Sequence, residues 1–428
     1  METSASPKAI GAASAIEEKL REIVGAASLR AASLADAISD QHARIVVEPG
    51  SEQELASVLR LANEVGLAVI PRGGGTKLDW GNTPTRADLI LSTARLAKVI
   101  EHVWADLTVT VEAGCTIQKL QDALSQHGQR LALDPLWPER ATVGGVLSTN
   151  DSGALRLRFG SLRDLIIGVT IALPDGTLAS SGGKVVKNVA GYDLPKLMTG
   201  ALGTLGVITR AVFRLHPLPK IVQSFSARMS NLETAQRVLH SVQNSKLAHA
   251  AMQVRAAGDV PPEVDVLFEG TKAGLAAQAT HLKKSLDPVV VAEAPASVWS
   301  ARQELWFTSD SAVIAKISLL PASIANGVET VRRVADHHKI RWKAVAEATG
   351  IGWLRLDGPP DYLHVAFREL RTEFESRGGS LAVLHRPAGI APLEAWGNAG
   401  DALPLMRAVK RQFDSKSTLN PGRFVGGI

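Results

Sequence analysis

Cysteine is nearly absent from this chain, because Cys115 is the only one among 428 residues. A single cysteine forms no disulfide within the chain and cannot hold an iron–sulfur cluster, which needs several thiolate ligands. Disulfides are typical of oxidising compartments, so we expect the chain in a reducing one. We interpret Cys115 as a small buried residue, and any iron–sulfur relay would have to come from another subunit.

Long apolar runs are also missing. The longest one, near residues 165–173, is too short to cross a bilayer. The first residues lack an apolar signal core, and Glu17 and Glu18 argue against a transit peptide. The sequence therefore predicts a cytoplasmic location, with the inner membrane reached only peripherally through partner subunits.

Aromatic residues make up only 4% of the chain, and its basic residues are dispersed. Lys and Arg number 47 against 42 Asp and Glu, which is a net charge of +5. Nucleic-acid-binding proteins more often show a basic stripe with interleaved aromatic side chains. Nucleic acid is therefore not an expected partner, and the 45% hydrophobic content is that of an ordinary globular protein.

The length predicts two or three domains at roughly 150 residues each. Residues 1–38 read as a helical extension, and residues 39–219 as a domain that alternates strands and helices. The proline-rich stretch His216–Pro219 marks a boundary. Strand–helix–strand alternation then indicates an α+β domain over residues 220–412 that covers one face of the first, followed by a tail at 413–428.

A glycine loop, Pro71-Arg72-Gly73-Gly74-Gly75-Thr76, follows the apolar strand predicted at residues 67–70. Consecutive glycines reach backbone angles closed to other residues, so their N–H groups can converge on an anion. Thr76 adds a hydroxyl donor and Arg72 a positive charge. The spacing is not that of a dinucleotide fingerprint, and the alternative is a glycine-rich turn without a ligand.

Two further glycine-containing stretches follow. In residues 134–153, two prolines predict a rigid entry, Thr142 is placed to cap a short helix, and Gly144 and Gly145 allow close approach of a ligand. The alternative for this stretch is a connector that binds nothing. A third cluster of glycines, Gly200–Gly206, runs into a strand, and three such loops in one domain favour a large phosphate-bearing ligand.

These motifs together resemble a known family. PRGGGT, ATVGGVLSTNDSG and GTLGVIT, in this order, are similar to the FAD-binding domain of the vanillyl-alcohol-oxidase and p-cresol methylhydroxylase flavoproteins. The resemblance implies an α+β fold, with a two-part FAD-binding domain of the p-cresol methylhydroxylase type (39–219) followed by an α+β substrate or cap domain (220–412). The tail at 413–428, with FDSKSTLNPGRF, is then expected to return to the FAD domain.

A narrower resemblance is to the FAD-binding subunits of bacterial glycolate oxidases, carried by Lys187–Leu194, Phe159–Asp164 and Leu419–Arg423. In that family a longer flavoprotein subunit, a shorter one and an iron–sulfur subunit act together. The resemblance implies oxidation of glycolate to glyoxylate, with electrons leaving through the iron–sulfur partner.

The resemblance also implies which residues bind FAD. Those expected to wrap the pyrophosphate are Pro71, Arg72, Gly73, Gly74, Gly75, Thr76 and Lys77. Those expected beside the pyrophosphate, ribityl chain and flavin are Pro135, Ala141, Thr142, Gly144, Gly145, Ser148, Asn150 and Gly153. Val207, after Gly206, would contact the adenine end, while Asn420 and Arg423 would bring the tail back. Some relatives attach the flavin through a His in the first loop; none occurs here, so FAD is expected to be non-covalent.

The chain departs from the family in its substrate domain. Longer catalytic relatives carry a His-Gly-Asp-Gly-Asn-like motif that helps to bind metal or substrate, and this sequence has none; no metal site is predicted. The nearest candidate is His385 as a base, with Arg386 or Lys316 paired to a substrate carboxylate. The alternative is that His385 ends a core strand and that the cations are solvated.

Three hypotheses remain open from the sequence. The first is a flavoprotein subunit of a complex that oxidises a 2-hydroxy acid. The second is a self-sufficient FAD-dependent dehydrogenase of a D-2-hydroxy acid such as D-lactate. The third is a flavin-containing assembly or electron-relay subunit without a substrate site. The missing motif favours the first or third over the second.

Overall fold

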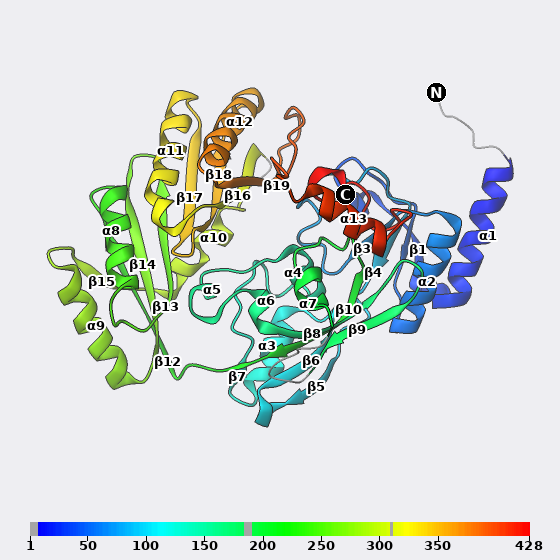
Figure 1. The fold of residues 1–428 in the computed structure, drawn as a ribbon, viewed down its shortest axis with the longest axis horizontal. Coiled ribbons are helices and arrows are strands. Elements are labelled where there is room, and N and C mark those ends of the chain that lie inside the picture. The colour runs from blue at the N-terminus through cyan, green and yellow to red at the C-terminus, as the bar shows by residue number, and fades with distance from the viewer. Residues whose placement is uncertain (1–6, 184–190, 309–310) are drawn as a thin grey trace.

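The computed structural model describes residues 7–183, 191–308 and 311–428, so part of the Lys187–Leu194 motif lies outside the described residues. Three main groups of strands follow one another along the chain (Figure 1). Within the described part, no helix is long and apolar enough to cross a membrane.

The first group is a small sheet in the order β1-β2-β4-β3, in which β2, β4 and β3 run parallel. Helix α2 connects β2 to β3, so the glycine loop follows a βαβ unit. Ser51 caps α2 by accepting from the N–H of Glu54, and Gly66 ends it with φ 73°. The elements are α1 (Pro7–Val24), β1 (Leu29–Ala31), β2 (Ile45–Val47), α2 (Glu52–Val65), β3 (Val69–Arg72) and β4 (Leu89–Ser92).

The second group is an antiparallel sheet in the order β5-β6-β10-β8-β9. Helices α3 and α4 pack against it through buried apolar side chains such as Leu120, Val146 and Leu147. Its strands are β5 (Val99–Val103), β6 (Thr108–Glu112), β8 (Ile166–Ala172), β9 (Leu178–Gly182) and β10 (Val207–Arg214). Its helices are α3 (Ile117–Ser125), α4 (Val143–Thr149), α5 (Arg156–Phe159), α6 (Leu162–Leu165) and α7 (Leu194–Met198), and β7 (Gln129–Arg130) pairs with β11 (His216–Pro217).

The third group is an eight-stranded sheet in the order β15-β12-β14-β13-β17-β18-β16-β19. Its strands are β12 (Ile221–Arg228), β13 (His249–Ala257), β14 (Val260–Gly270), β15 (Val291–Ala294), β16 (Ala312–Ser318), β17 (Arg341–Glu347), β18 (Ile351–Asp357) and β19 (Ser380–His385). Its helices are α8 (Leu232–Gln243), α9 (Lys272–Leu286), α10 (Ala301–Glu304), α11 (Ile324–His337) and α12 (Pro360–Ser376).

The two faces of this eight-stranded sheet differ because side chains alternate along each strand. Ala315, Leu354 and Ala344 belong to the apolar core under α8, α11 and α12. Their neighbours Lys316 and Trp353, which are paired in register across β16 and β18, therefore lie on the other face. That face is turned toward the first two groups of strands (Figure 1).

The C-terminal segment returns to the first sheet. After α13 (Leu403–Phe413), Leu419 forms a parallel bridge with Val69 of β3. The N–H of Val69 donates to the carbonyl of Thr418 at 2.7 Å, and the N–H of Asn420 donates to the carbonyl of Val69 at 3.0 Å. The chain terminus thereby lies beside the strand from which the glycine loop emerges.

Candidate cofactor and substrate site

A cavity opens at the glycine loop. Segments far apart in the sequence converge on it: the loop after β3, helix α4, the turn before β10 and the C-terminal tail. Its lining includes the predicted residues Pro71, Arg72, Gly73, Gly74, Gly75, Thr76, Lys77, Thr142, Gly144, Gly145, Ser148, Gly206, Val207 and Asn420, together with Leu78, Thr93, Leu202 and Arg423.

Close packing explains two of the three glycines in the loop. A Cβ on Gly73 would lie 2.0 Å from Thr142 Oγ1, and one on Gly74 would lie 1.8 Å from the carbonyl oxygen of Arg140. Only Gly75 has a positive φ, of +70°. The sequence argument rested on backbone angles, whereas the structure shows that Gly73 and Gly74 let the loop approach the segment that begins α4.

Arg72 carries an ion pair that the sequence argument missed. Its Nη1 lies 2.6 Å from Oδ1 of Asp36, a buried residue that also binds Arg30. Hydrogen bonds from Arg30 and Arg72 hold the pKa of the Asp36 carboxyl well below its ordinary value. The positive charge of Arg72 is therefore shared between the cavity and Asp36.

The ammonium group of Lys77 is turned away from the three glycines. Its Nζ lies 3.2 Å from Oδ2 of Asp151 and sits 5.7 and 5.3 Å from the ring centroids of Trp80 and Trp137. Burial lowers the pKa of Lys77. Lys77 is among the residues that line the cavity, and its Nζ also donates to Thr76 Oγ1 at 3.4 Å and to the carbonyl of Leu136 at 3.3 Å.

Buried polar atoms from the tail face the cavity without partners. Arg423 is 3% exposed; it donates to the carbonyls of Leu78 and Trp80, while its Nε has no partner among the described residues. Burial lowers its pKa to about 10. The Oδ1 of Asn420 is likewise unpartnered. A buried cation without a counter-ion is unfavourable, so these residues fit an anionic ligand such as the diphosphate of FAD.

Four predicted residues lie outside the cavity lining: Pro135, Ala141, Asn150 and Gly153. The backbone of Ala141 bonds to Ile117 and Trp137, and Asn150 ends α4 with φ 49°. The N–H of Gly153 donates to Asp134 Oδ1 at 3.0 Å. In this structure these residues shape the wall around α4.

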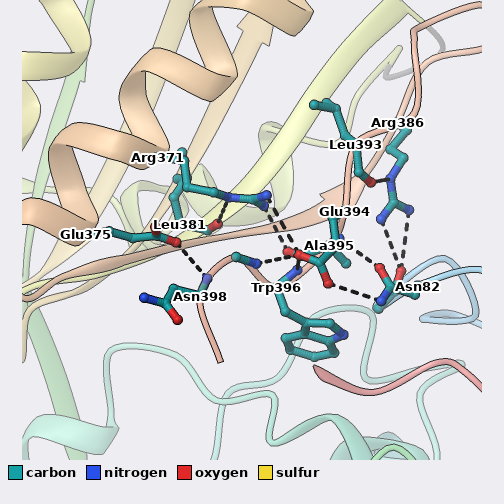
Figure 2. Close-up of polar contacts among 12 residues, drawn as sticks. Asn82, Arg371, Glu375, Leu381, Arg386, Leu393, Glu394, Ala395, Trp396 and Asn398 are labelled. Carbon is teal, nitrogen blue, oxygen red and sulfur yellow. Dashed lines mark hydrogen bonds and ion pairs between the residues drawn. The ribbon is translucent and has the colours of Figure 1, made fainter. Parts of the chain in front are cut away.

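The three substrate-site candidates are not brought together. Arg386 donates from Nε to the carbonyl of Leu393 at 3.0 Å and from both Nη atoms to the carbonyl of Gly81. Figure 2 shows its guanidinium between Leu393 and the backbone beside Asn82. Nδ1 of His385 lies 3.8 Å from Oδ2 of Asp79, and its ring meets the edge of Trp306. Lys316 lies on β16, the strand next to β19, where its register partner is Ala382.

Lys316 instead belongs to a group of charged residues that the sequence argument missed. We call it the junction cluster: Asp134, Asp151, Arg156, Arg302, Lys316 and Glu347. Arg302 joins its two sides, because it lies 3.3 Å from Asp151, donates to the carbonyl of Ser152 at 2.6 Å and stacks 4.5 Å from the Trp353 ring centroid. No group of three or more His, Cys, Asp or Glu residues in the described part is arranged to hold a metal ion.

The chain is similar in sequence to known FAD-dependent proteins. A family profile described as an FAD binding domain matches residues 43–182. The glycolate oxidase subunit GlcD of Bacillus subtilis (strain 168) is 27% identical over 417 residues, covering 88% of both chains. The chain is a GlcD-like FAD-dependent oxidoreductase. The chain is also similar to D-lactate dehydrogenase of Archaeoglobus fulgidus, which is 36% identical over 207 residues, covering 48% of this chain and 46% of that one.

The fold of this GlcD-like protein is that of p-cresol methylhydroxylase. A substrate-bound structure of that enzyme has a TM-score of 0.75 at 15% identity and covers 96% of each chain. The predicted fold class, a p-cresol methylhydroxylase-type FAD-binding fold with a cap domain, is therefore confirmed.

Proposed function

We propose that this GlcD-like chain is the FAD-binding subunit of a glycolate oxidase-like complex. The complex oxidises a 2-hydroxy acid, with glycolate as the first candidate, to the 2-oxo acid. The observation that carries the proposal is the cavity on which the glycine loop, α4 and the tail converge, together with the buried Arg423 whose Nε has no partner among the described residues. Support for the substrate class comes from the similarity to GlcD over 88% of the chain.

Bound FAD would accept the hydride that leaves the α-carbon. The chain binds and orients it: the N–H groups of the glycine loop and the Thr76 hydroxyl hold the diphosphate, and Arg423 offsets negative charge. FAD is held non-covalently, since no His lies between Pro71 and Trp80. Val207 contacts the adenine end through its backbone.

We further propose that electrons leave through an iron–sulfur subunit and that a second flavoprotein subunit completes the complex. The single cysteine supports this division of labour, because this chain cannot supply the ligands of a cluster. The protein reaches a membrane only through such partners, and otherwise stays in the cytoplasm.

Lys316 is the candidate that we propose for the substrate carboxylate. Arg386 is occupied by backbone carbonyls, whereas Lys316 lies on the face of the eight-stranded sheet that is turned toward the cofactor domain. The cap domain, which we propose spans residues 220–412, would thus contribute the substrate contacts.

An anaerobic absorbance spectrum of the purified FAD-loaded chain, alone and with co-purified partners, tests the proposal. Glycolate should bleach the flavin bands in the complex. Bleaching of the isolated chain by D-lactate with turnover of an artificial acceptor would instead favour a self-sufficient dehydrogenase, for which the 36% identity to D-lactate dehydrogenase is the support. Flavin that no 2-hydroxy acid bleaches in the complex would contradict both and leave an electron-relay subunit.

A further inference from the structure

Glu347 is a buried carboxyl group with an unused oxygen. It ends β17, is 2% exposed, and its Oε2 has no hydrogen-bond partner among the described residues. Leaving a buried carboxyl oxygen without a donor is costly. Such an oxygen would be stabilised by a hydrogen-bond donor from a bound ligand, because the described residues supply none.

Lys316 presents the complementary case. Among the described residues, its side chain forms neither a hydrogen bond nor an ion pair, although it lies within the junction between domains. The residue is only partly exposed, and burial lowers the pKa of its ammonium group. A partly buried ammonium group without a counter-ion is suited to bind an anion.

The sheet register places these two groups on one face. Lys316 pairs with Trp353, and Trp353 pairs with Val345. Glu347 follows Val345 by two residues on β17, so it points to the same side. Only β18 lies between the two strands, which puts their backbones roughly 10 Å apart across the sheet. Two long side chains at this spacing can reach the ends of one small molecule.

The surroundings favour an anion. The charged groups near Lys316 are Asp151, Arg156, Arg302 and Glu347, and those near Glu347 are Asp134, Arg302, Lys316 and Arg156. Arg302 and Lys77 already neutralise Asp151 through contacts of 3.3 and 3.2 Å. Lys316 is therefore a cation on this face for which the described residues offer no carboxylate in ion-pair contact.

We propose that the junction cluster is the 2-hydroxy-acid site, with Lys316 binding the carboxylate and the Glu347 carboxylate accepting the proton of the α-hydroxyl. This inference rests on the proposed function. The O–H bond would break as Glu347 gains the proton, and the α-hydrogen would leave with both electrons of the C–H bond. Bound FAD would supply the acceptor for this hydride. The carbon–oxygen bond of the substrate becomes the carbonyl of the 2-oxo acid.

The environment of Glu347 suits this role. Burial, and next the charge of Asp134, raise the pKa of the Glu347 carboxyl well above its ordinary value. Raising the pKa makes the ionised carboxylate a stronger base, and the group acts as a base only after it has lost its proton. Flavin reduction should therefore become faster as pH rises and Glu347 loses its proton. His385 lies beside Asp79 and Trp306.

The test uses the full FAD-loaded chain together with its co-purified partners. Four variants are compared: Glu347→Gln, Glu347→Asp, Lys316→Met and Lys316→Arg. Exposed Glu293 on β15 and exposed Lys343 on β17 supply the matched controls Glu293→Gln and Lys343→Met. Anaerobic stopped-flow follows flavin reduction, and titration with oxalate, an unreactive analogue, follows binding through the flavin spectrum. A thermal melt shows which variants remain folded.

We expect Glu347→Gln to slow flavin reduction about 100-fold or more, while oxalate affinity changes by less than about threefold. Glu347→Asp should recover part of the rate and retain its pH dependence. Lys316→Met should weaken oxalate binding about tenfold or more, and Lys316→Arg should restore much of it. Both control variants should match the unaltered protein.

The outcomes separate this inference from the proposed function. A protein that glycolate bleaches, with Glu347→Gln and Lys316→Met unchanged in rate and oxalate affinity, would overturn the site and leave the function standing. If glycolate, D-lactate and longer 2-hydroxy acids all fail to bleach the unaltered complex, the proposed function and the role of Glu347 both fail. If Glu347→Gln does not fold, Glu347→Asp with an unaltered rate and pH profile would overturn the role of Glu347.

Discussion

At the scale of single residues, position 74 must be a glycine because a neighbouring carbonyl lies too close for any side chain. The Cβ of any other residue there would fall 1.8 Å from the carbonyl oxygen of Arg140. No side-chain rotation relieves such a contact, because the backbone fixes the position of Cβ and the oxygen belongs to the main chain. The glycine loop could not keep its approach to the segment that begins α4.

We therefore expect Gly74→Ala to weaken FAD binding about 30-fold or more, since the loop must move out of the cavity wall. Titration of the FAD-free chain with FAD, followed by fluorescence, measures the dissociation constant. Gly183→Ala is the control, because no atom of the described residues lies within 4 Å of a Cβ at that position. Equal affinity in both variants would show that the loop does not hold the cofactor.

Asp36 leads to a prediction of pH dependence. Its pKa is lower in the folded chain than in the unfolded one, owing to Arg30 and Arg72. A group of this kind stabilises the fold above its unfolded pKa, and that contribution is lost as the pH falls toward its folded pKa. Asp36→Asn should lower the free energy of unfolding by about 2 kcal/mol at pH 7.

Urea denaturation at several pH values measures the effect. The difference between the unaltered chain and Asp36→Asn should shrink as the pH falls below about 4, where the unfolded carboxyl takes up its proton. Asp361→Asn, at an exposed residue, is the control. The difference in the free energy of unfolding between this variant and the unaltered chain should not shrink in the same way. A difference that stays constant down to pH 2 would contradict the role assigned to the ion pairs.

At the scale of elements, the C-terminal tail acts as an added strand. Leu419 bridges Val69 and is fully buried among the residues of the first sheet and α2. Asp414 supports it by accepting the N–H groups of Thr418 and Leu419 and pairing with Lys410 at 2.6 Å. The position of Asn420 and Arg423 at the cavity depends on this strand.

Leu419→Ala should lower the free energy of unfolding by about 2–4 kcal/mol, because it leaves a cavity in the core. It should also reduce FAD affinity, since the tail residues that line the cavity lose their anchor. Leu405→Ala is the control, because Leu405 is 68% exposed on α13. Unchanged FAD affinity in a destabilised Leu419→Ala chain would show that the tail does not position the site.

At the scale of the whole molecule, polar contacts join the FAD-binding part to the eight-stranded sheet. Arg130 donates to both carboxylate oxygens of Glu269, at 2.8 and 2.6 Å, and both side chains are largely buried. Arg302 forms the second connection and lies within the junction cluster. A third, around Asn82 and Glu394, is drawn in Figure 2. These contacts fix the distance between the cofactor cavity and Lys316.

A double-mutant cycle with Arg130→Met and Glu269→Gln should give a coupling energy of about 1–3 kcal/mol in the free energy of unfolding. Each single variant should lower the free energy of unfolding by more than the double variant does, because each single change leaves a buried group without its partner. Exposed Arg332 and Glu329 on α11 form a control pair, for which about 0.5 kcal/mol or less is expected. Additive effects for Arg130 and Glu269 would mean that this contact does not hold the parts together.

The sequence by itself determined the glycine loop, the helix caps at Ser51 and Thr142, and the class of fold. These features depend on neighbours in the chain: glycine runs, capping residues and apolar spacing are local, so they can be read along it. The family resemblance added the tail, whose motif is also contiguous.

Only the tertiary structure decided which charged residues meet. Lys77 was expected at the diphosphate, yet its ammonium group pairs with Asp151, 74 positions along the sequence numbering. Glu347 carries no local signal, because an acidic residue at a strand end is ordinary until the sheet register buries it. Burial and long-range pairing set the charge state of these groups, and both arise only when distant strands come together.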